Sequence, residues 1–100
     1  MDTMLGINLI AMNPEVRAGR PYLLGTTITV ADIAIAKIFH RLEPEEIAEN
    51  HNLTLPQVYA ALAYYYDHKA EIDANIQERR RLAAEMKEKR VGSRHQSLFG

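Results

Sequence analysis

The stretch from Glu43 to Tyr66, EPEEIAENHNLTLPQVYAALAYYY, decides the fold, because it has the pattern of two helices joined by a turn. Pro44 suits the first turn of a helix, where its missing N–H costs nothing, and the glutamates after it favour the positive end of the helix dipole. Asn50 to Asn52 then compete for backbone hydrogen bonds and end this short helix. Thr54 and Gln57 have the spacing of a capping box, which begins a second helix. The stretch therefore predicts a helix-turn-helix.

The charge of the same stretch also fits an αα-hairpin that only builds a core. From Leu42 to His68 there is no Lys or Arg, whereas five Asp and Glu residues lie there. A helix that reads DNA normally carries positive charge, because neutralising phosphates provides most of the non-specific affinity. The helix pair can therefore be a DNA reader or a scaffold, and the sequence leaves both interpretations open.

Two short apolar runs, Ile7–Met12 and Pro21–Leu24, precede the helix pair and are separated by a segment that contains Pro14 and Gly19. This arrangement predicts two strands of a β-hairpin. Thr29, with Asp32 three residues later, predicts a capped helix that begins at Val30. The buried stripe of this helix is expected to include Val30, Ile33, Ala34, Ile38 and either Phe39 or Leu42.

The helical pattern continues beyond the tyrosines, because no Gly or Pro occurs between Pro56 and Gly92. An unbroken helix from Thr54 to Arg90 would be roughly 55 Å long at about 1.5 Å per residue, which exceeds the diameter of a small domain. Part of it must project. We expect a body at residues 1–66 and a helical arm with a tail at residues 67–100.

An interrupted heptad pattern runs along the arm and favours contact with a partner. Ile72 and Ile76 have no evident apolar partner in their own chain, so an amphipathic helix lying in the groove of another protein is the favoured interpretation. The alternative is a charged helix whose two isoleucines fold back on the body. The residues expected to bind a partner are Ile72, Ile76, Arg79 and Met86.

Composition and charge limit the class of protein. With 100 residues, 47% hydrophobic and 25% charged, the chain suits one small folded domain, and the absence of Cys excludes disulfides and thiolate sites. The N-terminus lacks the pattern of a signal peptide or a membrane span, so we expect a cytoplasmic protein without membrane contact. Residues 1–68 hold four Lys and Arg against eight Asp and Glu, and residues 69–100 hold eight against five. A body of charge −4 is thus joined to an arm of charge +3, which suits an acidic partner or nucleic acid.

Nothing in the sequence predicts catalysis. The four histidines, at positions 40, 51, 68 and 95, lack the spacing of a metal site, and no nucleophile stands beside a recognisable base and orienting group. We therefore expect no enzyme activity, no catalytic residue, no metal and no cofactor.

A family resemblance follows from several motifs taken together. The chain resembles the bacterial family called domain of unknown function 433, and it is similar to VapB-type antitoxins, over roughly residues 8 to 70. The motifs that carry this resemblance are Gly19-Arg20-Pro21, the run from Leu24 to Ile33, Pro44-Glu45-Glu46-Ile47, Leu53-Thr54, Val58 and Ala61 to Tyr65. Two positions depart from the family pattern: Thr27 replaces an Arg, which removes a fork able to bind phosphate or carboxylate, and Arg41 replaces a Gly.

The resemblance implies a mainly α fold: a small β-hairpin followed by a three-helix, winged or homeodomain-like helix-turn-helix body, here with a long C-terminal helix. It also implies an antitoxin that neutralises a PIN-like toxin through its arm. A homodimer is expected, because the hairpin edge and the arm would leave surface uncovered in a monomer. Operator DNA is a further possible partner, and the residues expected to contact it are Arg17, Arg20, Gln57 and Tyr59. The alternative function is a homodimeric adaptor that does not bind DNA.

Overall fold

The computed structural model describes residues 1–3 and 6–99, and it describes side chains in the last helix as far as residue 87. The chain divides into two compact units, Met1–Lys69 and Ala70–Gly100, which we call the body and the arm. The described residues are mainly helical, with four α-helices and a small antiparallel hairpin near the N-terminus. None of the described helices carries an apolar run long enough to cross a bilayer.

The predicted hairpin is present, but its strands are shorter than the apolar runs. Strand β1 (Ile10–Ala11) pairs with β2 (Tyr22–Leu23), with Ile10 opposite Leu23 and Ala11 opposite Tyr22. One further bond, from the N–H of Leu24 to the carbonyl oxygen of Leu9 at 2.9 Å, extends the contact. Pairing stops because Asn13 begins a turn, in which its carbonyl accepts from Val16, and because Pro21 has no N–H to donate.

Helix α1 (Val30–Ile38) begins at the predicted capping box. The hydroxyl of Thr29 accepts from the N–H of Asp32 at 3.1 Å, and the Asp32 carboxylate accepts from the N–H of Thr29 at 3.0 Å. Before this cap, the chain turns at Gly25, whose φ of 83° glycine adopts without strain. The predicted burial of Ile38 is wrong: it is exposed, since Ala36 takes the buried position in the last turn.

Helices α2 (Pro44–His51) and α3 (Leu55–Asp67) form the predicted pair, joined by Asn52–Thr54. Glu43 and Glu46 cap α2 reciprocally, and Thr54 and Gln57 cap α3 in the same manner. Asn52 ends α2 in the left-handed conformation, with a φ of 55°, which asparagine tolerates better than most residues. The boundaries of the pair are therefore fixed locally, by caps at both starts and by a left-handed residue between them.

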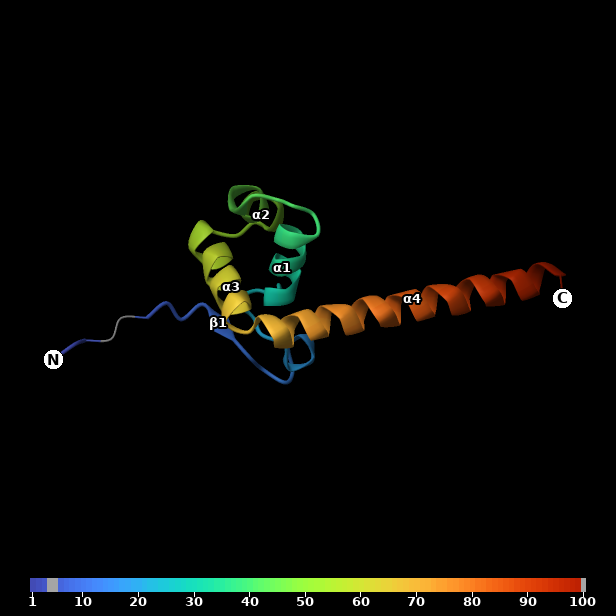
Figure 1. Ribbon diagram of the computed structural model, residues 1–100, viewed down its shortest axis with the longest axis horizontal. Helices are drawn as coiled ribbons and strands as arrows, with labels where there is room; N and C mark the ends of the chain where they lie inside the picture. The colour runs from blue at the N-terminus through green and yellow to red at the C-terminus, as the bar shows by residue number, and fades with distance from the viewer. Residues whose placement is uncertain (4–5, 100) are drawn as a thin grey trace. The chain divides into compact units, whose positions relative to one another are not determined.

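The core of the body lies where α1 and α2 pack on α3, as Figure 1 shows. Its largest fully buried side chains come from β2, all three helices and the cap of α1: they are Leu23, Thr29, Val30, Ile33, Ile47, Val58 and Tyr65. The helical spacing predicts that Leu55, Val58, Leu62 and either Tyr65 or Tyr66 face inward. Val58, Leu62 and Tyr65 are buried, but the prediction for Leu55 is wrong, because it lies in the first turn of α3 and is 40% exposed. This packing holds the opposite face of α3 outward.

The helical pattern after α3 is interrupted at His68, so the unbroken helix from Thr54 to Arg90 that the sequence would allow is not formed, and a separate C-terminal helix follows the three-helix body. His68 has φ −124° and ψ 35°, and its N–H is shared between the carbonyl oxygens of Tyr64 and Tyr65. The His68 ring stacks on Tyr64 with centroids 4.0 Å apart, and its Nδ1 lies 3.1 Å from the Tyr64 carbonyl oxygen. A second helix, α4 (Lys69–Phe99), then begins. Because His68 competes for helical carbonyls, the break needs neither Gly nor Pro.

Arg41 occupies a backbone conformation that usually belongs to glycine. Its φ is 55°, in the connection between α1 and α2. A side chain in this left-handed region costs roughly 1 kcal/mol, whereas glycine is unstrained there. Glycine would adopt this conformation without strain, so Arg41 retains the turn at a cost.

Candidate interaction surfaces

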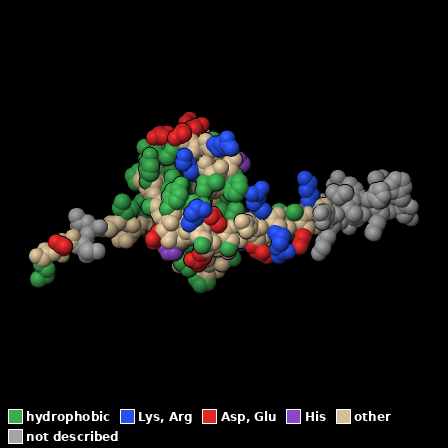
Figure 2. Space-filling model, in the orientation of Figure 1, with side chains coloured by type: hydrophobic (Ala, Val, Ile, Leu, Met, Phe, Trp, Pro, Cys, Tyr) green, Lys and Arg blue, Asp and Glu red, His purple; other side chains and the backbone are tan. Residues whose placement is uncertain are grey.

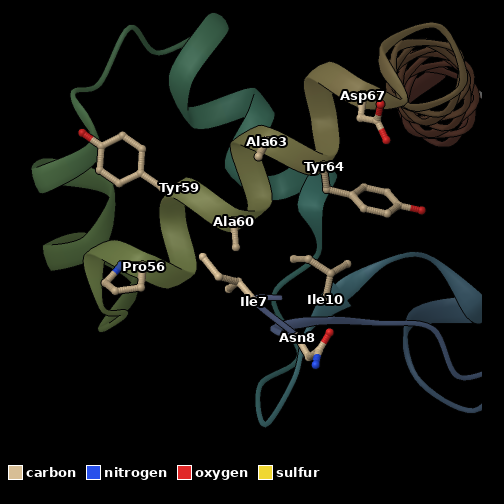
Figure 3. Close-up of a pocket in the computed structure, with 9 residues that line it drawn as sticks. All are labelled: Ile7, Asn8, Ile10, Pro56, Tyr59, Ala60, Ala63, Tyr64 and Asp67. Atoms are coloured by element: carbon tan, nitrogen blue, oxygen red, sulfur yellow. The ribbon is translucent and has the colours of Figure 1, made fainter. Parts of the chain in front are cut away.

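An open groove of about 720 Å³ lies in the body between the N-terminal segment and α3. Ile7 and Ile10 form one side, and Figure 3 shows them along the small side chains of Ala60 and Ala63. The remaining lining residues are Asn8, Pro56, Tyr59, Tyr64 and Asp67. Because most of these side chains are apolar and the small alanines leave room, the groove, which we call the α3 groove, can accept apolar groups of another molecule.

The outer face of α3 is apolar and aromatic. Tyr59 and Tyr66 are 52% and 58% exposed. Pro56, which precedes Tyr59 on this face, and Ala63, which lies between the two tyrosines, are exposed as well. These four positions lie three or four residues apart, so they follow one another along the helix surface. Tyrosine supplies large contact area at a low entropic cost and is enriched in protein interfaces. In a helix-turn-helix that reads DNA, the exposed face of the second helix enters a groove of the duplex. The exposed face of α3 instead has the composition that is typical of a protein contact.

The charges around this face are negative. Asp67 is the only charged residue within α3, and its carboxylate lies 3.6 Å from Nδ1 of His68. On α2, the side chains of Glu45, Glu46 and Glu49 are exposed. Figure 2 shows acidic side chains gathered at the end of the body where α2 lies. Such a surface repels phosphates and attracts a cationic partner.

Arg17, which was expected to contact DNA, bonds within the body. Its Nη1 donates to the carbonyl oxygen of Thr27 at 2.9 Å and to the Asp32 carboxylate at 3.3 Å. Residue 27 is the position at which the family pattern has an arginine. The guanidinium of Arg17 thus contacts the backbone of residue 27. It also contacts the carboxylate of Asp32, which belongs to the capping box of α1.

The other residues expected to contact DNA are not brought to one place with Arg17. Gln57 is half-buried, and its Oε1 accepts from the N–H of Thr54 at 2.8 Å, so the capping box uses part of this side chain. Tyr59 lines the α3 groove. Arg20 is half-buried in the loop before β2. The four residues therefore have different local surroundings, and only Tyr59 lies on the apolar face.

The four residues expected to bind a partner through the arm differ in exposure. Ile72 and Ile76 are 4% and 2% exposed, Arg79 is half-buried, and Met86 is 63% exposed. Leu82, four residues before Met86, is 45% exposed. Because residues four apart share a helix face, Leu82 and Met86 form an exposed apolar pair, which we call the arm face.

Ion pairs stabilise the helix around the arm face. Arg81 donates to Glu78 at 2.6 Å and to Glu85 at 2.6 Å, which are spacings of three and four residues. The hydrogen bond from Arg81 lowers the pKa of Glu78, and the same bond raises the pKa of Arg81. These exposed pairs support the helix, whereas the apolar pair beside them is available for contact.

Within the described residues, no group of three or more His, Cys, Asp or Glu residues is placed to hold a metal ion. The groove itself carries one carboxylate, that of Asp67, and one amide, that of Asn8. Its chemistry is therefore that of an apolar contact with a polar rim.

Sequence reasoning missed the α3 groove, although one signal for it was present. Pro56, Tyr59, Ala63 and Tyr66 alternate with the inward residues Val58, Leu62 and Tyr65 and thus mark a second apolar face of the same helix. The contribution of Ile7, Asn8 and Ile10 has no such signal, because it depends on how the hairpin packs.

Comparison with known proteins identifies a family for this chain. No curated protein and no solved structure matches it. The family model described as protein of unknown function (DUF433) matches residues 10–65, which include the hairpin, α1, α2 and nearly all of α3. Because the match spans more than half of the 100 residues, the chain belongs to the DUF433 family.

Proposed function

We propose that this chain is an antitoxin-like protein of a bacterial type II toxin-antitoxin system, and that binding a protein partner is its principal activity. The partner is a PIN-like toxin, as the likeness to VapB-type antitoxins implies. The chain neutralises the toxin through the arm, where the arm face provides apolar contact, and it forms a homodimer when no toxin is bound.

The observation that carries this proposal is the exposed apolar face of α3 in a helix pair without cations. Tyr59 and Tyr66 are exposed there, and the stretch from Leu42 to His68 contains no Lys or Arg. Exposed aromatic anchors beside a groove are typical of protein interfaces, whereas DNA contact requires cations for phosphate neutralisation. The arm adds a second exposed apolar site, at Leu82 and Met86.

Repression of its own operon is a second candidate function, and the geometry of α2 and α3 favours it. The two helices are capped and joined by the short connection Asn52–Thr54, as in a homeodomain-like helix-turn-helix. Cations for DNA contact come from outside the pair, from Arg20 and the arm. A homodimeric adaptor that binds neither toxin nor DNA is the remaining alternative, and the acidic surface of α2 is compatible with it.

Co-expression tests the proposal. A gene for a PIN-like protein next to the gene for this chain is expected, and induction of that toxin should stop bacterial growth unless this chain is also produced. Replacing the arm face by Leu82→Asp with Met86→Asp should reduce the rescue at least tenfold, because two charges would be buried at the contact. Met12→Asp, also at an exposed apolar residue, is the matched control and should rescue fully. Full rescue by the arm variant, or no rescue by the unaltered chain, would overturn the proposal.

A further inference from the structure

We propose that the dimer forms by reciprocal exchange: the arm face of each copy lies in the α3 groove of the other. This inference rests on the homodimer in the proposed function and specifies its contact. Each copy then contributes one groove and one arm, so the contact occurs twice around a two-fold axis and the assembly closes at two chains.

The groove has the shape and composition for such an occupant. Its volume of about 720 Å³ is open along α3, and Ala60 and Ala63 leave space between larger side chains at its two ends. Those larger side chains are Tyr59 and Tyr64. A leucine and a methionine from one face of a helix can fit above the two alanines, because small residues let another helix approach closely, and methionine adapts to irregular gaps.

The arm offers a matching occupant. Leu82 and Met86 lie one turn apart on one face of α4 and are both exposed. Lys87, adjacent to Met86, is exposed as well. An apolar pair with a cation beside it complements a groove that has Asp67 at its rim.

Charge over the two units favours the same pairing. The body, residues 1–69, carries −3 and the arm, residues 70–100, carries +2, so a body attracts an arm, whereas body–body and arm–arm contacts bring like charges together. Within the body, the side of α2 and α3 that could face an arm lacks any Lys or Arg. A second copy is therefore an occupant whose charge and apolar groups both fit the groove.

Met86 cannot contact Ala63 within one chain. Met86 lies roughly 25 Å along α4 from Lys69, and Ala63 lies only about 9 Å along α3 from the same residue, at about 1.5 Å per residue. Two points at such different distances from one residue stay more than about 10 Å apart, beyond the reach of a side-chain contact. A contact between Met86 and Ala63 thus requires a second chain. Because the toxin is proposed to bind the arm face too, toxin and groove would compete for each arm.

The absence of cysteine in the chain makes a direct test possible. One preparation carries Ala63→Cys in the groove and the other carries Met86→Cys on the arm face, both at exposed positions, so neither change should unfold the protein. The two preparations carry tags of different size, are mixed, and are oxidised mildly without any toxin. We expect a mixed disulfide between the two chains, at least tenfold more abundant than in a control mixture of Met12→Cys with Met86→Cys.

Two other outcomes would overturn the exchange. Disulfides formed mainly between two Ala63→Cys chains would show grooves facing each other, and equal yields from the test and control mixtures would show random collision. Sedimentation of the unaltered chain accompanies the test. A dimer in sedimentation without the mixed disulfide would refute the exchange and leave the proposed toxin binding intact, whereas a mixed disulfide without toxin neutralisation in co-expression would do the reverse.

Discussion

The guanidinium of Arg17 lies 3.3 Å from the carboxylate of Asp32, and the same carboxylate accepts a hydrogen bond from the N–H of Thr29, the N-cap residue of α1. Arg17 in the loop and Thr29 at the helix cap thus both bond to the carboxylate of Asp32, which lies 15 positions after Arg17 in the sequence. The Thr27 carbonyl, at 2.9 Å, adds a second bond to the same Nη1. These bonds hold the loop between β1 and β2 against the N-terminus of α1.

This relationship predicts that Arg17 contributes to stability. Arg17→Ala should lower the free energy of unfolding by about 1 kcal/mol, because it removes a hydrogen bond and a partly exposed ion pair. Asp32→Ala should cost more, about 1–2 kcal/mol, since the bond from the Thr29 N–H in the capping box of α1 is lost as well. Urea denaturation measures both values, with Arg20→Ala as the matched loop control. An equal loss of stability for Arg17→Ala and Arg20→Ala would contradict the role assigned to the ion pair.

Arg41 provides a prediction in the opposite direction. Arg41→Gly should raise the melting temperature, with a gain of about 0.5–1 kcal/mol, because glycine adopts a φ near 55° without strain and its greater freedom in the unfolded chain offsets only part of this gain. Asn52→Gly, at a residue with the same φ, is the control and should change stability less, since asparagine already tolerates that conformation. A clear loss of stability in Arg41→Gly would show that the arginine side chain makes a compensating contact.

The fold was predictable from the sequence wherever a boundary depends on neighbouring residues. The caps at Thr29 and Thr54 lie within three residues of their partners, and both were identified. The break at His68 was missed, because it depends on a histidine ring that competes for a carbonyl rather than on Gly or Pro. Nor does the sequence indicate that Arg17 bonds to Asp32, since this contact exists only once the hairpin has packed beside α1.

The candidate site was less predictable than the fold for a related reason. The tyrosine-rich helix was recognised, but the assignment of its tyrosines to core or surface required the packing of α1 and α2 on α3. Tyr65 proves to be buried, and Tyr59 and Tyr66 are exposed. On the arm, the residues named for partner contact included Ile72 and Ile76, which are almost fully buried, while Leu82, which is exposed, was not named.

The arm should lose helix content in acid. Because the bond from Arg81 lowers the pKa of Glu78, the folded helix holds this carboxylate ionised more firmly than the unfolded chain does. The stabilisation is therefore present above the ordinary pKa of a glutamate in the unfolded chain, and it is lost as the pH falls through the lower pKa of the folded helix. Circular dichroism at 222 nm from pH 7 to pH 2 measures the loss. Arg81→Gln should remove this component of the titration, and an unchanged profile in that variant would contradict the assignment.

DNA binding should be weak and should not depend on α3. Any affinity for the promoter of its own gene must come from cations outside α2 and α3, so Arg20→Ala should reduce the log–log salt slope by about 0.9 per chain. Gln57→Ala and Tyr59→Ala should leave the slope unchanged. Fluorescence anisotropy at several salt concentrations tests this. Specific binding that disappears in Gln57→Ala would establish a base-reading helix and favour the operator function.

Titration calorimetry with the purified PIN-like toxin tests the central claim, that this chain is above all a protein-binding antitoxin. The unaltered chain should bind the toxin with a defined stoichiometry. Leu82→Asp with Met86→Asp should weaken the binding at least tenfold, while its circular dichroism spectrum remains that of a folded helical protein, as in the Met12→Asp control. Toxin binding that is absent in the unaltered chain, or equally tight in the arm variant, would contradict the account.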